Sequence, residues 1–124
     1  MGLSGQLTPI VFVPKFTSYV GTGNYRTSPI DVSAYSGGTF VAWRGPLVGD
    51  PATHPGLFVV IQDSEDENNW FDLAHADLDA VELDTVDITL TRRWLRCNVQ
   101  LHNDTGTDPA AVTCWCVGSL ERRV

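Results

Sequence analysis

The chain has 124 residues, 43% of them apolar and 19% charged, which fits one compact domain and is too short for two ordinary ones. Eight lysines and arginines against fifteen aspartates and glutamates give a net charge of −7, which argues against binding to a phosphate backbone. No apolar run approaches the roughly 20 residues of a membrane-spanning helix. We therefore expect no membrane as partner and, because of the net charge, no nucleic acid. The first residues lack the basic and apolar regions of a secretory signal, which predicts synthesis in the cytoplasm.

Short alternating segments separated by clusters of Gly, Pro, Asn, Asp and Ser predict β-strands at residues 10–13, 30–33, 39–44, 57–62, 69–73, 86–91, 94–102 and 111–117. The first of these lies between Pro9 and Pro14, which lack the N–H of a sheet ladder, so we expect it at a sheet edge or in an arm. Residues 72–80 would place polar groups on all sides of a helix and are expected to form a connection. The Gly- and Pro-rich loop at 45–56 is expected to lack regular structure.

The last two predicted strands alternate most clearly. They place apolar residues on one face, namely Leu95, Cys97, Val99 and Leu101 in the first and Val112, Cys114 and Cys116 in the second. The polar turn at 103–109 predicts that the two form one long hairpin. Three cysteines in a cytoplasmic chain favour buried, reduced thiols over a cross-link from Cys97 to one of the others.

Eight short strands without a helix predict an all-β fold, an antiparallel β-sandwich or jelly roll. The sandwich is expected to occupy residues 29–124 as a single domain. Residues 1–28 have a lower apolar density and many turn formers, which predicts an extended N-terminal arm that gains order on a partner surface.

The residues that carry chemistry show no catalytic pattern. His54, His75 and His102 lie far apart without the spacing of metal ligands, and no Gly-x-Ser-x-Gly motif is present. We therefore expect no enzyme, no cofactor and no metal site. Ten of the fifteen carboxylates fall between residues 63 and 87. A calcium loop there would use oxygens of Asp63, Glu65, Asp66 and Glu67, but the hand-loop pattern is not matched, and a solvated face or a surface for a basic partner are the alternatives.

Four tryptophans, Trp43, Trp70, Trp94 and Trp115, raise the question of an exposed aromatic surface. Alternation turns Trp94 and Trp115 away from the apolar face, and Trp and Arg are enriched in the cores of protein interfaces. The candidate interface residues are Trp94, Arg96, Trp115, Phe12, Phe16, Asp63, Glu65, Asp66 and Glu67. The alternative is a glycan-binding module in which indole faces stack on sugar rings.

Four segments carry a resemblance to small β-rich virion structural proteins of tailed bacteriophages. Residues 59–73 resemble their pattern of a strand, a polar turn, a Trp and an Asp-Leu pair. The other segments are the Ser-Pro-Ile-Asp-Val-Ser-Ala-Tyr opening at 28–35, the Arg-Trp-Leu-Arg strand at 93–99 and the closing strand with its basic tail at 117–123. The sequence departs from the pattern in its acidic turn without glycine at 65–69 and in its longer loop at 45–56.

The resemblance implies a non-enzymatic capsid decoration, or cement, protein. Such a protein is made in the host bacterial cytoplasm, sits on the surface of the phage head, and binds and stabilises the lattice of the major capsid protein. It also implies a homo-oligomer such as a trimer. The alternatives are a tail or neck structural component, which could use the same sandwich, and the glycan-binding module.

Overall fold

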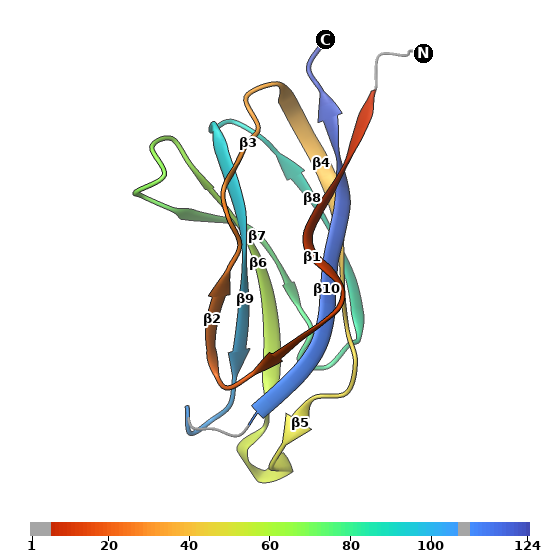
Figure 1. The fold of residues 1–124 in the computed structure, drawn as a ribbon, viewed down its shortest axis with the longest axis vertical. Helices are drawn as coiled ribbons and strands as arrows, with labels where there is room; N and C mark the ends of the chain where they lie inside the picture. Colours follow the sequence, from red (N-terminus) through yellow and green to blue (C-terminus); the bar gives the residue numbers. More distant parts are fainter. Residues whose placement is uncertain (1–5, 107–109) are drawn as a thin grey trace.

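The computed structural model describes residues 6–106 and 110–124, which form ten β-strands in two antiparallel sheets that pack face to face (Figure 1). Sheet A contains, in spatial order, β1 (Leu7–Val20), β10 (Ala110–Arg122), β4 (Tyr35–Arg44) and β8 (Leu83–Thr89), with β5 (Val48–Gly49) paired to one end of β10. Sheet B contains β2 (Gly23–Arg26), β9 (Trp94–His102), β6 (Gly56–Ser64) and β7 (Phe71–Asp77), with β3 (Ile30–Asp31) also paired to β9. The predicted all-β sandwich is confirmed.

The core lies between the two sheets and follows the predicted alternation of the last two strands. The inward side chains of β9 are all at most 1% exposed, and those of β10 at most 2%. Cys97 on β9 and Cys114 and Cys116 on β10 are buried and free of disulfides, as the sequence predicts. Burial raises the pKa of the Cys114 thiol to about 12, and a hydrogen bond with Cys116 together with burial raises that of Cys97.

The predicted hairpin between the last two strands is wrong. β9 pairs with β6 and β2 in sheet B, whereas β10 pairs with β1 and β4 in sheet A (Figure 1). Each of these strands has one apolar face, and the two faces cover each other across the core. The connection between them therefore crosses from one sheet to the other.

The described part of the predicted arm lies within the sandwich. β1 pairs with β10 from Leu7–Glu121 to Val20–Ala111, and β2 pairs with β9. β1 is an edge strand, in agreement with its prolines, and it contains two register shifts, the second of which includes Pro14. Phe12 and Val13 are 8% and 1% exposed, so apolar burial holds this segment in place. Residues 1–5 of the predicted arm lie outside the described residues.

Two connections contain more structure than predicted. The strand predicted at 69–73 begins at Phe71 and continues through the predicted connection to Asp77 as β7. Ala74, Ala76 and Leu78 alternate with polar residues there, a period of two that places Ala76 and Leu78 in the core. The 45–56 loop contains β5 and a 3-10 turn at Pro51–Thr53, which the Asp50 side chain caps by accepting from the N–H of Ala52. Within the described ranges, no helix is long and apolar enough to cross a membrane.

Candidate interaction surfaces

The outward face of sheet A carries an aromatic cluster on neighbouring strands. Trp115 on β10 lies directly opposite Trp43 on β4, and Trp43 lies opposite Leu83 on β8. The flanking positions Ala42, Arg44, Cys114 and Cys116 are buried, so alternation turns both indoles outward. The two rings stack with centroids 6.0 Å apart.

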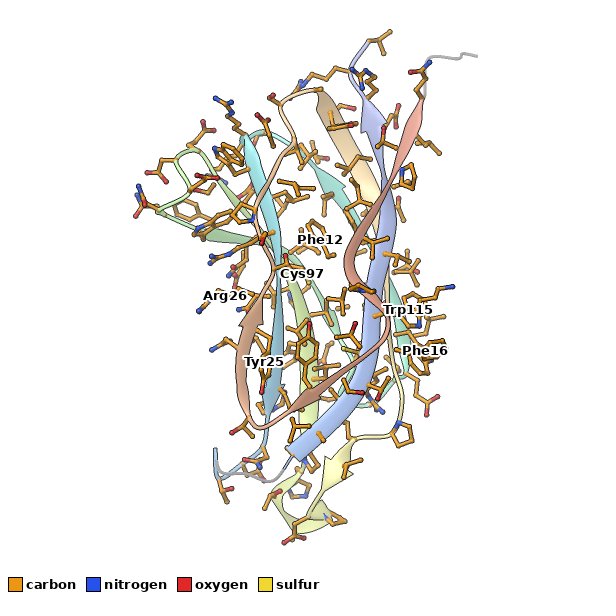
Figure 2. The ribbon with its side chains drawn as sticks, in the orientation of Figure 1. Phe12, Phe16, Tyr25, Arg26, Cys97 and Trp115 are labelled. Atoms are coloured by element: carbon orange, nitrogen blue, oxygen red, sulfur yellow. The ribbon has the colours of Figure 1, made fainter. Side chains whose placement is uncertain are left out.

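Phe16 joins this cluster from β1. The second register shift of β1 lies between Val13 and Thr17, and Phe16 within it has a φ of 65°, the left-handed region that only glycine adopts freely. Its ring is 71% exposed and meets Trp43 edge-on, with centroids 6.1 Å apart. A strained bulge that presents a phenyl ring to solvent is typical of a contact site. Figure 2 shows Phe16 and Trp115 together on the side of sheet A that faces away from the core.

The cluster extends along the sheet and has one charged member. Val117 of β10 lies opposite Val11 of β1 and Val41 of β4, so an outward row of valines borders the indoles. Lys15, the only lysine of the chain, lies over the Trp115 ring at 5.4 Å from its centroid. We call this surface the aromatic patch; it consists of Val11, Lys15, Phe16, Val41, Trp43, Leu83, Trp115 and Val117. Its aromatic and aliphatic composition is that of a protein contact.

Trp94 and Arg96 were predicted to share an interface with Trp115, but they lie on the opposite side of the molecule. Both are on β9 and point outward from sheet B. The Arg96 guanidinium lies 4.1 Å from the centroid of the Trp70 ring, and its Nε donates to Oε1 of Gln62 at 2.8 Å. The structure therefore divides the predicted tryptophan interface between two surfaces.

The acidic residues of the predicted interface also separate. Glu65, Asp66 and Glu67 lie exposed on the turn between β6 and β7, whereas Asp63 is completely buried and accepts a hydrogen bond from Arg92 at 2.9 Å. In the turn, Asp66 accepts from the backbone N–H groups of Asn69 and Asn68, which lower the pKa of its carboxyl. Its carboxylate closes the turn. Residues 6–106 and 110–124 contain no group of three or more His, Cys, Asp or Glu placed to hold a metal ion.

Phe12 lies in the core, with its ring 5.2 Å from that of Phe40, so it is not part of an outward surface (Figure 2). Sequence reasoning did not select Trp43 and Leu83 as interface residues. Trp43 could have been found, because Phe40, Ala42 and Arg44 alternate with it and point inward, which turns Trp43 outward. Nothing in the sequence indicated that β4 separates β10 from β8, which is what brings Leu83 to the indoles.

Comparison with known proteins found a structural likeness but no related sequence. No protein-family model and no curated protein matches the chain. Its structure is similar to a chain in the structure of infectious bursal disease virus, Gx strain, with a TM-score of 0.59 and 10% sequence identity. The match covers 95% of this chain and 32% of the viral chain, so the protein spans about a third of that chain's length. At 10% identity the likeness concerns the fold alone, and the virus is not a tailed phage.

Proposed function

We propose that the chain is a non-enzymatic virion structural protein of a tailed bacteriophage that decorates the assembled head and docks through the aromatic patch. The observation that carries the proposal is the patch itself, an outward sheet face with Phe16 71% exposed, Val11 59% and Leu83 55%. The phage motifs at 28–35, 59–73, 93–99 and 117–123 and the viral sandwich fold support it.

Contiguous apolar surface of this kind is unfavourable in water and marks a contact site. Most of the patch is uncharged, although the chain as a whole carries −7. Lys15 at its border would meet an acidic group of the shell, which would set the orientation of docking. A protein that binds the assembled shell in preference to its free subunits stabilises the shell by its binding free energy at every occupied site.

Co-sedimentation with head shells that lack the protein tests the proposal. Recombinant chain is mixed with purified shells, and Phe16→Ser is compared with Phe71→Ser, which removes a 51% exposed phenyl group from sheet B. We expect saturable binding of the native chain, a loss of about tenfold or more in affinity for Phe16→Ser, and little change for Phe71→Ser. Failure to sediment, or equal loss in both variants, would contradict docking through the patch.

A tail or neck location remains the alternative within the same class, and the number of copies in each virion separates it from head decoration. A glycan-binding module would instead use free indole faces. In the aromatic patch, Trp43 and Trp115 stack on each other and Lys15 covers part of Trp115, which favours a protein partner for this surface. Self-association, for example as a trimer, is part of the proposal, and light scattering of the purified chain measures it.

A further inference from the structure

The outward face of sheet B has a different chemistry from the aromatic patch. Arg26 on β2 lies opposite Asn98 on β9, and Arg96 is the next outward residue along β9. Asn24 and Gln100 form the adjacent cross-strand pair. Polar side chains of three types, guanidinium, amide and carboxylate, thus gather here, and we call this surface the amide face; it consists of Asn24, Arg26, Asp72, Arg96, Asn98 and Gln100.

The two arginines of the amide face have no carboxylate partner among residues 6–106 and 110–124. Arg92 and Arg93, by contrast, pair with Asp63 and Asp31. Burial and the neighbouring charge of Arg26 lower the pKa of Arg96. Two cations that repel each other, in a chain that carries −7, form a site that a bound anion would stabilise. Figure 2 shows Arg26 on the β2 side of the sandwich, away from Phe16 and Trp115.

Asn98 lies between these arginines on the same face. It is 1% exposed, and its Oδ1 has no hydrogen-bond partner within the described structure. Its Nδ2 is 3.4 Å from Oδ1 of Asn24. Buried amide oxygens are rarely left without a donor, because such a group loses its hydrogen bonds to water without replacement. The unpaired oxygen lies just below the surface, so donors are locally scarce between the two guanidinium groups, and the exposed polar groups around it are the ones that a ligand can reach.

The surface is hollowed on both sides of Gln100. One hollow of about 210 Å³ is lined by Phe58, Val60, Asp72, His75 and Gln100. The other, of about 370 Å³, lies beside Asn24 and Gln100 at the ends of β2 and β9. Asp72 Oδ1 accepts from Nε2 of Gln62 at 2.8 Å, which fixes the carboxylate at the first hollow. Amide groups both donate and accept, and a carboxylate accepts, so the hollows match hydroxyl groups.

We propose that the amide face binds an acidic saccharide, with the sugar carboxylate on Arg26 and Arg96 and its hydroxyl groups on Asn24, Gln100 and Asp72, which line the two hollows. Guanidinium groups bind carboxylates through paired, charge-assisted hydrogen bonds. An acidic peptide would satisfy the arginines but supplies few hydroxyl groups for the amides. The apolar residues beside this face include Phe58 and Val60 in the first hollow and Trp70, whose ring Arg96 covers, in contrast to the exposed Phe16 of the aromatic patch.

Isothermal titration calorimetry of the full chain with an oligogalacturonate tests this assignment. The matching neutral galacto-oligosaccharide, a hexaglutamate peptide and inorganic phosphate are titrated in parallel. Arg26→Gln is the test variant, because Arg26 is exposed and its side chain makes no hydrogen bond within the described ranges. Arg122→Gln is the matched control, since it removes the same charge from an exposed position on β10 of the other sheet.

We expect the oligogalacturonate to bind and the neutral sugar to bind with an affinity at least about tenfold lower. Arg26→Gln should weaken oligogalacturonate binding by about tenfold. Arg122→Gln should leave the Kd unchanged. No binding of oligogalacturonate at millimolar concentration would overturn the proposal. Equal binding of the neutral sugar, equal or tighter binding of hexaglutamate or phosphate, or equal weakening by Arg122→Gln would each overturn it as well. Thermal unfolding of both variants verifies that they are folded.

Discussion

Asp63 is the residue whose environment departs most from its place in the sequence. It begins an acidic run, yet its side chain points inward at the end of β6 and is completely buried. Its Oδ1 accepts from Nη1 of Arg92 at 2.9 Å, and Oδ2 has no partner among the described atoms. Arg92 lies in the connection from β8 to β9, which crosses from sheet A to sheet B, and its guanidinium covers the Phe71 ring at 4.5 Å. The ion pair thus ties this crossing to the core.

Removal of one partner of this pair should be costly. Asp63→Ala leaves Arg92 with no counterion in a partly buried position, and we expect a loss of about 3 kcal/mol in the free energy of unfolding. Replacement of both residues by leucine should cost less than that single change, because no uncompensated charge remains. Urea unfolding of the two variants measures the difference. A single-variant loss below about 1 kcal/mol would show that the pair contributes little.

Asp66 predicts a dependence of stability on acid pH. Its folded-state pKa is lowered, chiefly by hydrogen bonds from the backbone of Asn69 and Asn68, so its contribution is present above the unfolded pKa and is lost as the pH falls below about 4. We expect the native chain to melt at a higher temperature than Asp66→Asn at neutral pH, and this difference to shrink as the pH is lowered through that range. Melting curves at several pH values measure it, and a constant difference would contradict the account.

At the scale of elements, β1 decides whether the N-terminal segment is part of the sandwich. Val13 is 1% exposed and Val11 is 59% exposed on the same strand, which makes them a matched pair. Val13→Ala should lower the free energy of unfolding by about 2 kcal/mol and Val11→Ala by less than about 0.5 kcal/mol. Chemical unfolding of both variants provides the comparison. If both variants lost equally little unfolding free energy, the segment would be an arm that is not packed in the free protein, and the account would be contradicted.

The strands show what a single sequence can and cannot predict. Alternation in β9 and β10 correctly predicted which side chains are buried, because the period of two follows from backbone geometry. It could not predict that these strands lie in different sheets, since pairing depends on residues far away in the chain. Only the start of β7 was predicted, as the strand at 69–73, because its later inward residues include two alanines, whose small side chains give a weak apolar signal.

At the scale of the whole molecule, the two outward faces differ in chemistry. Sheet A presents aromatic and aliphatic groups, whereas sheet B presents amides and arginines, with Trp94 and the exposed Phe71 beside them. Alternation correctly predicted that Trp115 and Arg96 point outward, whereas their division between two faces required the strand order. A thin sandwich with unlike faces can dock on a lattice with one side and leave the other side exposed to solvent. Under this account, Arg26→Gln leaves shell docking unchanged and Phe16→Ser leaves oligogalacturonate binding unchanged, and the two binding assays measure both.

The copy number of the chain in purified virions from its source tests the structural role most directly. Quantitative mass spectrometry would give the ratio of this chain to the major shell protein. Head decoration predicts a ratio of one or a simple fraction, because a decoration protein occupies equivalent lattice sites. A few copies per particle would contradict head decoration and indicate the neck or tail, and absence from the particle would contradict a virion role altogether.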